Sequence, residues 1–218
     1  MTSGPMSPLR VLVVDDNPDD RAFVARELAR EFPGVVVEQV GDLEQLAAAL
    51  ERGPHDLAIT DYHLHWSDGI SVLREVKDRW PDCPVIMLTG AGSEEVAVEA
   101  MKAGLDDYVL KSARHRLRLP AAARLALERS RQRRSERDAE TRYRELFETV
   151  PVGIYRSTPD GTFLDVNPAM AVMLGFPDRD ALMAVRATEL YVDPADRDRW
   201  LAVLERDGVV RDYEVRVW

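Results

Sequence analysis

The sequence predicts an α/β protein whose first half is a doubly wound, five-stranded parallel sheet flanked by helices. Over the first 115 residues, short apolar runs alternate with amphipathic stretches, as expected for parallel strands joined by crossover helices. The run Leu9–Val14 is almost continuously apolar, which is typical of a strand buried on both faces. Polar residues follow four of the five apolar runs, at the edge where sheets of this kind carry their sites.

Local signals mark the limits of these elements. Asn17 can cap the first helix, Pro18 suits its first position, and Pro33-Gly34 ends it. The further strands are expected at 35–40, 56–60, 85–88 and 107–110, and the further helices at 43–51, 69–80 and 93–103. Five strands with these connections predict a sheet of the flavodoxin-like type.

Composition excludes several classes of protein. Hydrophobic residues make up 45% and charged residues 31%, which fits a globular protein and not a disordered one. No apolar run approaches the about 18 residues of a membrane span, and no secretory signal is visible. Cys83 is the single cysteine, so we expect no disulfide framework and a reducing, cytoplasmic location.

Charge is unevenly placed along the chain. Residues 1–115 hold 11 Lys and Arg against 21 Asp and Glu, so the whole net charge of −10 lies there. The remaining residues hold 18 of each sign. This balance gives no basic footprint for nucleic acid, and we expect no nucleic-acid or membrane partner.

A long, charged helix is predicted after Pro120. Residues 121–127 are strongly helical, and residues 129–144 are almost wholly charged with many Arg. Apolar residues then return at three- and four-residue spacing, at Ala139, Tyr143, Leu146 and Val150. We interpret this stretch as a solvated linker helix with a narrow seam through which two copies pair, rather than as a nucleic-acid contact.

A smaller α+β pattern begins at Pro151. Two strands, 153–156 and 162–166, flank the turn Pro159-Asp160-Gly161, which is typical of a hairpin. Short helices are expected at 169–174, 179–183 and 196–205. The residues Val209–Trp218 alternate in polarity and predict a further strand.

Four strand ends of the first half carry polar groups, namely Asp15 and Asp16, Asp61, Thr89, and Lys111. Each of these residues alone is weak evidence for a functional site, because an acid after an apolar run is more often a helix cap. The predicted fold brings the four ends together where the sheet changes direction. Three crowded carboxylates repel one another unless a cation offsets them, and an all-oxygen site suits Mg²⁺.

This combination predicts phosphoryl chemistry. Asp61 is expected to be the nucleophile and to form an aspartyl phosphate. Mg²⁺ is expected on Asp16 and Asp61, more loosely on Asp15, with the backbone carbonyl of His63 completing the shell. Lys111 would bind one phosphoryl oxygen and Thr89 another; the rings of His63 and His65 are not expected to bind metal.

Residues 9–119 resemble a response-regulator receiver domain of two-component signalling. The resemblance is carried by the segments 13–17 (VVDDN), 61–64 (DYHL), 68–69 (DG), 88–90 (LTG) and 107–111 (DYVLK). It implies a phosphohistidine donor on a sensor histidine kinase or phosphotransfer protein. It also implies a switch in which Thr89 moves toward the phosphoryl group and Tyr108 turns inward.

Two positions depart from the family pattern. The family usually has Pro where this chain has His65, and usually Pro after the lysine, where it has Ser112. The peptide after Lys111 is often cis in the family because of that proline, so the local loop is expected to differ. Neither departure touches the phosphoryl chemistry.

The residues from Tyr143 onward resemble the start of a PAS sensory domain. The carrying segments are 143–148 (YRELFE), 151–155 (PVGIY), 160–161 (DG), 165–169 (DVNPA) and 174–176 (LGF). PAS domains end with two further strands, which we expect to be missing here. No histidine follows His115 and no cysteine follows Cys83, which disfavours His-ligated haem and a cysteinyl-flavin adduct and leaves the PAS ligand open.

The expected organisation is a disordered N-terminus (1–8), a receiver domain (9–119), a helical linker (120–142) and an incomplete PAS domain (143–218). The leading hypothesis is a phosphorelay module that acts on an output outside this chain, such as a histidine kinase or diguanylate cyclase. The alternative is a pseudo-receiver that dimerises without phosphorylation. An enzyme on this fold is disfavoured: a phosphatase would carry a second acid where His63 stands, and Asp15–Asp20 would repel a flavin phosphate.

Overall fold

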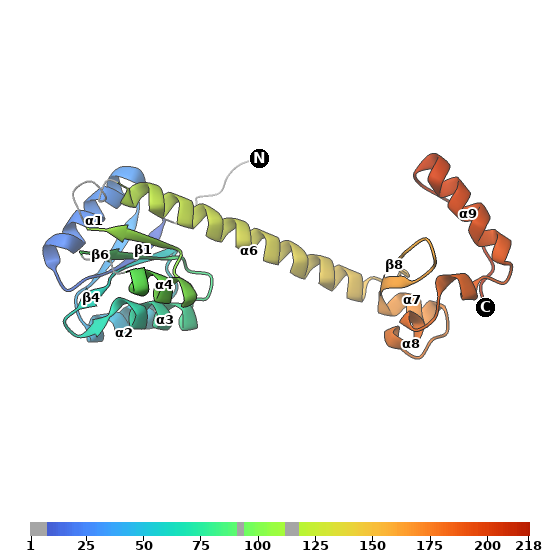
Figure 1. The fold of residues 1–218 in the computed structure, drawn as a ribbon, viewed down its shortest axis with the longest axis horizontal. Coiled ribbons are helices and arrows are strands. Elements are labelled where there is room, and N and C mark those ends of the chain that lie inside the picture. The colour runs from blue at the N-terminus through green and yellow to red at the C-terminus, as the bar shows by residue number, and fades with distance from the viewer. Residues whose placement is uncertain (1–7, 91–93, 112–117) are drawn as a thin grey trace. The chain divides into compact units, whose positions relative to one another are not determined.

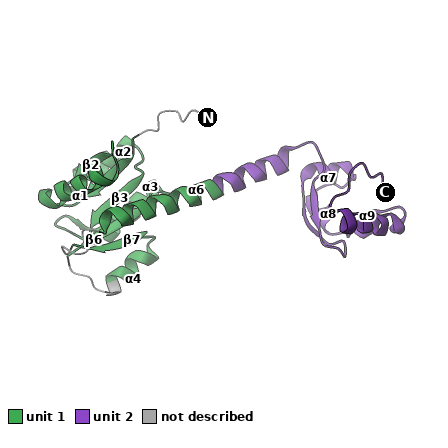
Figure 2. Cartoon of the chain, turned by 90° about the horizontal axis from the view of Figure 1, so that it is seen from above, with its two compact units in different colours: residues 1–136 green, residues 137–218 purple. Residues whose placement is uncertain are grey.

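The computed structural model describes residues 8–90, 94–111 and 118–218, which form two compact units. Figure 2 shows these units as residues 1–136 and 137–218. Three expectations lie outside the described residues: nearly all of the disordered N-terminus, the start of the helix at Ser93, and the peptide after Lys111. Within the described part of the chain, no helix is both long and apolar enough to cross a bilayer.

A five-stranded, wholly parallel sheet forms the centre of unit 1 (Figure 1). Its strand order is β2-β1-β3-β6-β7. The strands are β1 (Arg10–Val14), β2 (Val36–Val40), β3 (Leu57–Asp61), β6 (Val85–Thr89) and β7 (Asp107–Leu110). This topology confirms the predicted doubly wound, flavodoxin-like fold.

Helices cover both faces of this sheet. They are α1 (Pro18–Glu31), α2 (Leu43–Arg52), α3 (Gly69–Arg79), α4 (Glu94–Lys102) and the first half of α6 (Leu119–Thr149). Side chains alternate along each strand, so that Val11 and Val13 of β1 pack with α1 and α6, while Leu12 and Val14 face α2, α3 and α4. The strands β1, β3 and β6 are therefore buried on both faces, as the continuous apolar run of β1 predicted.

The segment 119–127 of α6 belongs to the core of unit 1. Leu119, Ala122, Ala123 and Ala126 are buried against β3, β6 and β7. The helix then continues past residue 136 into unit 2 without a break. The proposed linker thus begins with residues that pack on the sheet, and its exposed part lies beyond them.

The start of α1 follows the signals read from the sequence. The side chain of Asn17 accepts a hydrogen bond from the backbone N of Asp19, and Pro18 occupies the first helical position. The capped end of α1 lies directly after β1, at the carboxyl edge of the sheet. This edge is where the polar residues gather.

At the opposite edge of the sheet, Asp106 joins three elements. Its Oδ2 accepts hydrogen bonds from Nζ of Lys77 (2.8 Å) and the backbone N of Val85 (3.0 Å), and its Oδ1 accepts one from Arg133 (2.8 Å). Burial alone would raise the pKa of Asp106, but these donors outweigh it and hold that pKa below its usual value. Asp106 therefore anchors both α3 and α6.

Asp106→Asn is expected to lower the free energy of unfolding of unit 1 by about 2 kcal/mol at pH 7. The reason is that Lys77 and Arg133 lose the buried carboxylate to which they donate. The depressed folded pKa means that this stability is present above the unfolded pKa of about 3.9 and is lost as pH falls through the folded value. Urea unfolding at pH 7 and pH 3.5 checks this. A difference between wild type and variant that does not shrink in acid would contradict it.

Unit 2 is built on a two-stranded antiparallel hairpin, β8 (Tyr155–Ser157) and β9 (Phe163–Val166). The elements α7 (Pro168–Met173), α8 (Arg179–Met183), η1 (Ala187–Leu190) and α9 (Pro194–Asp207) follow. Asn167 is fully buried: its Oδ1 accepts from the backbone N of Ile154 and of Met170, and its Nδ2 donates to the carbonyl of Val152. The hairpin and the helices α7, α8 and α9 were predicted from the sequence, whereas the short 3-10 helix η1 was not.

The prediction of a strand at Val209–Trp218 is wrong. This segment makes one isolated bridge, between Val217 and Tyr191, and is otherwise irregular. Asp212 has a φ of 51°, which lies in the left-handed region and interrupts an extended chain. Alternating polarity indicates a strand only where a neighbouring strand is present to pair with it.

Candidate functional site

The four predicted strand ends meet at the carboxyl edge of the sheet in unit 1. Asp15 directly follows β1, Asp61 ends β3, Thr89 ends β6, and Lys111 follows β7. The registers pair these strands side by side, with β3 between β1 and β6. Asp15, Asp61 and Thr89 are buried, although two of them are acids.

Lys111 is the centre of the ionic network. Its Nζ donates to Oδ2 of Asp15 (2.7 Å), of Asp61 (2.8 Å) and of Asp20 (2.9 Å). The ammonium group has three protons, and three carboxylates receive them. Burial alone would lower the pKa of Lys111, but the hydrogen bonds to these carboxylates outweigh it and raise the pKa, so the residue stays charged.

Backbone N–H groups fix the buried carboxylates. Oδ1 of Asp15 accepts from the N of Asn17 (2.8 Å), and Oδ1 of Asp61 accepts from the N of Tyr62 (2.7 Å). Burial raises the pKa of Asp15, against the lowering effect of Lys111 and Asn17. Holding Asp15 ionised in this place therefore costs free energy, and a further positive charge at the site would reduce that cost.

The donor set fits a hard divalent cation. One ligand oxygen from each of Asp15, Asp16 and Asp61 lies within 4.8 Å of the others. Ligand oxygens at opposite corners of an octahedral Mg²⁺ site are separated by about 4 Å, because each Mg–O bond is about 2.1 Å. Small side-chain shifts would therefore let all three oxygens reach one ion, and the described ligands of this cluster are all carboxylates, with no soft ligand among them to favour another metal class.

Asp16 contacts the loop that follows Asp61, the candidate phosphoacceptor. A short hairpin, β4 (His63–Leu64) with β5 (Ser67–Asp68), lies between Asp61 and α3. The backbone N of His65 donates to Oδ2 of Asp16 (2.8 Å), and Nδ1 of the same residue contacts that oxygen. His63 is exposed with its ring against Tyr62 at 4.6 Å, and its proposed carbonyl ligand remains a prediction.

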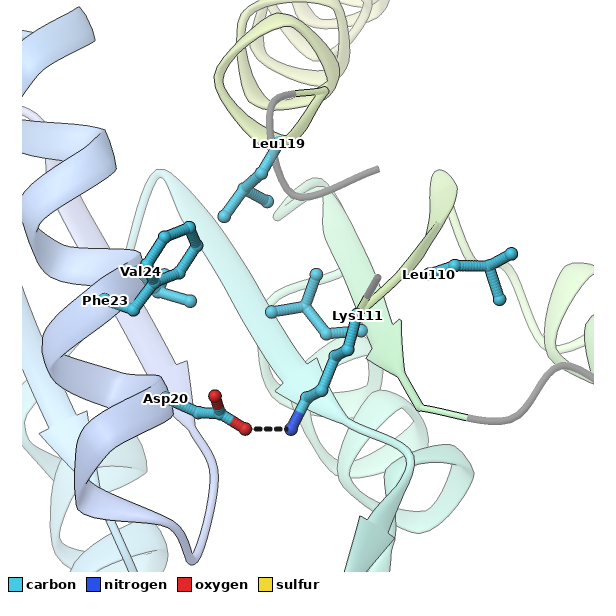
Figure 3. A pocket seen from close by; sticks show the side chains of 7 residues that line it. Asp20, Phe23, Val24, Leu110, Lys111 and Leu119 are labelled. Carbon is cyan, nitrogen blue, oxygen red and sulfur yellow. Dashed lines mark hydrogen bonds and ion pairs between the residues drawn. The ribbon is translucent and has the colours of Figure 1, made fainter. Parts of the chain in front are cut away.

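Asp20 is a site residue that the sequence analysis missed. Its carboxylate lies in the first turn of α1 and binds Lys111, as Figure 3 shows. Next to this ion pair lies an apolar pocket lined by Phe23, Val24, Leu88, Leu110 and Leu119. The position in the first turn of the helix after β1 was the available signal, because that turn faces the carboxyl edge of the sheet.

The neighbouring backbone leaves no room for a side chain at position 69, where the chain has a glycine. A Cβ atom built on Gly69 would lie 2.5 Å from the carbonyl O of Asp61 and 2.9 Å from Cα of Tyr62. The backbone N of Gly69 donates to the carbonyl of Tyr62 at 2.8 Å. The backbone of α3 thus packs directly on the residue proposed to accept the phosphoryl group.

Tyr108 does not join the carboxylates. Its ring is half-buried against the core that faces α2, α3 and α4. Its hydroxyl is buried, and no described residue forms a hydrogen bond with it. Its switch role, like that of Thr89, therefore remains an implication of the family resemblance.

Comparison with known proteins agrees with this geometry. The family model for the response regulator receiver domain matches residues 11–123, and a PAS domain model matches residues 141–206. A solved receiver domain protein (CheY-like) from Methanospirillum hungatei has a TM-score of 0.53 at 27% identity and covers 58% of this chain and 99% of that one.

Two curated relatives extend the comparison. Response regulator protein PilR of Pseudomonas aeruginosa is 33% identical over 106 residues, which are 49% of this chain and 23% of PilR. Transcriptional regulatory protein ResD of Bacillus subtilis is 31% identical over 172 residues, which are 77% of this chain and 69% of ResD. The chain thus spans about a quarter of PilR. It belongs to the response regulators of two-component signalling, with a receiver domain followed by a PAS domain.

Proposed function

We propose that Asp61 accepts a phosphoryl group from a phosphohistidine on a partner kinase or phosphotransfer protein. The observation that carries this proposal is the contact of Lys111 with Asp61 beside a cluster of three carboxylates. A structural ion pair needs one acid for one base. Here three acids bind one lysine, and a fourth acid, Asp16, lies beside two of them, at the sheet edge where ligands bind.

The chemistry needs a nucleophile, a cation and positioned donors. A carboxylate oxygen of Asp61 forms the new O–P bond while the P–N bond of the donor breaks and its electron pair returns to the imidazole. Lys111 gives up a carboxylate partner to bind a phosphoryl oxygen, and the hydroxyl of Thr89 donates to another. Positioning and charge suffice, because phosphoryl transfer demands little other covalent chemistry from the protein.

Asp15, Asp16 and Asp61 would hold Mg²⁺, together with the backbone carbonyl of His63. Bound there, the ion offsets the negative charge of the phosphoryl group. The backbone N–H groups of Asn17 and Tyr62 hold two of these carboxylates in place, those of Asp15 and Asp61 respectively. The chain acts in this proposal as a phosphoacceptor and not as an enzyme with turnover.

Removal of the metal is expected to abolish phosphorylation. Phosphoramidate carries a P–N bond, as phosphohistidine does, and should yield one phosphoryl adduct per chain when Mg²⁺ is present. Excess EDTA should prevent the adduct, and added Mg²⁺ should restore it, because the acidic cluster otherwise repels the donor. Intact-mass spectrometry measures this; equal labelling with and without chelator would contradict the proposed metal role.

Phosphorylation is proposed to act through α6 on the PAS domain and an output beyond it. The start of α6 packs near Lys111, since Leu119 lines the same pocket. Thr89 and Tyr108 would change position on phosphorylation, as the family resemblance implies. We place this relay in the cytoplasm, with a histidine kinase or diguanylate cyclase as possible outputs.

A second candidate, a dimerisation module independent of phosphorylation, is favoured by one observation. On α6, Tyr143 and Leu146 are 60% and 68% exposed, at the spacing of the predicted seam. Both candidates include a homodimer through α6 and the PAS domain. The phosphoramidate experiment separates them, because the second predicts no adduct under any condition.

A further inference from the structure

We propose that His65 is a positioning residue for the metal site: it holds one oxygen of Asp16 and thereby presents the other to the cation. This inference rests on the proposed role of Asp16 as a magnesium ligand. It concerns a residue that does not touch the reacting atoms. Its basis is a two-point contact between loops that are far apart in the sequence.

Two nitrogen atoms of His65 meet the same oxygen. Its backbone N donates a hydrogen bond to Oδ2 of Asp16 at 2.8 Å, and its Nδ1 contacts Oδ2 as well. A carboxylate accepts, so a ring that carries its proton on Nδ1 can donate to this oxygen. No described residue donates to Oδ1 of Asp16, which leaves that oxygen as the one available to a cation.

The other two carboxylates of the cluster are held differently. Asp15 and Asp61 each bind Lys111 through Oδ2 and a neighbouring backbone N–H through Oδ1. Asp16 does not bind Lys111, so His65 supplies its contacts in place of the lysine. Without the ring, one backbone hydrogen bond would have to hold the Asp16 carboxylate alone.

The contact is a property of this chain. Receiver domains usually carry Pro at this position, and proline has neither a backbone N–H nor a polar side chain. The Asp16 carboxylate is only 14% exposed, whereas the His65 side chain is 91% exposed. Hydrogen bonds from the surroundings of a metal site orient its ligands and strengthen binding, and an exposed donor contributes less than a buried one.

Calorimetric titration of Mg²⁺ into the full chain, without any phosphodonor, tests the inference. His65→Ala is expected to weaken Mg²⁺ binding about three- to tenfold. His65→Asn keeps an N–H donor near the place of Nδ1 and is expected to restore most of the affinity. Equal affinity of wild type and His65→Ala, or tighter binding by that variant, would overturn the proposal.

Phosphorylation by phosphoramidate over a range of Mg²⁺ concentrations gives a second readout. The Mg²⁺ concentration for half-maximal rate should rise in His65→Ala by the same factor, while the rate at saturating Mg²⁺ stays at the wild-type value. A lower rate at saturation that His65→Asn fails to restore would indicate a distorted loop and overturn the positioning role. Absence of labelling with intact Mg²⁺ binding would count against the proposed function and leave the calorimetric result standing.

Discussion

Lys111→Met is expected to abolish phosphorylation and to lower the free energy of unfolding of unit 1 by about 2 kcal/mol at pH 7 without Mg²⁺. Lys111 donates to three carboxylates, and its side chain is only 13% exposed. Methionine fills a similar volume but leaves those acids without their shared cation. The phosphoryl group would also lose the ammonium that is proposed to bind one of its oxygens.

Urea unfolding and intact-mass labelling measure these two effects. Mg²⁺ should recover part of the lost stability, because it supplies positive charge to the same oxygens. Lys102→Met is the matched control: Lys102 is exposed at the end of α4 and contacts no carboxylate of the site. Wild-type stability and labelling in the Lys111 variant would show that the network does not have the proposed role.

Gly69→Ala is expected to destabilise unit 1 by about 1–3 kcal/mol, the usual cost of forcing an extra carbon into packed structure. The new Cβ would lie 2.5 Å from the carbonyl of Asp61. Because the obstacle is backbone and not a flexible side chain, either α3 or the end of β3 must move. We therefore expect slower labelling of Asp61 as well as the loss of stability.

Gly90→Ala serves as the comparison, since apart from its chain neighbours no atom of the described residues lies within 4 Å of a Cβ placed on Gly90, and its φ is ordinary. Denaturant unfolding of both variants, followed by labelling under identical conditions, checks the prediction. Wild-type stability in Gly69→Ala would mean that α3 does not pack on the phosphoacceptor backbone as described.

The sequence predicted most of unit 1 because its signals are local and repeated. The central strands β1, β3 and β6 are apolar runs, and Asn17 and Pro18 mark the start of α1 by rules that need no tertiary contact. The convergence of Asp15, Asp61 and Lys111 then followed from parallel topology alone, since the carboxyl ends of such strands share an edge.

The features that could not be predicted from the sequence depend on residues that are neighbours in space but distant along the chain. Asp20 could be recognised as a helix-start acid, but its contact with Lys111 joins residues 91 positions apart. The contact of His65 with Asp16 spans 49 positions and depends on the shape of a short hairpin. The error at Val209–Trp218 has the same origin, because alternation cannot tell whether a partner strand is present.

The most direct test compares the intact masses of wild type and Asp61→Asn after incubation with acetyl phosphate and Mg²⁺. The amide keeps the size of the side chain but removes the nucleophilic carboxylate, so the variant should fold. We expect a single phosphoryl adduct on wild type and none on Asp61→Asn. An adduct that persists on the variant, or no adduct on folded, Mg²⁺-bound wild type, would contradict the role proposed for Asp61.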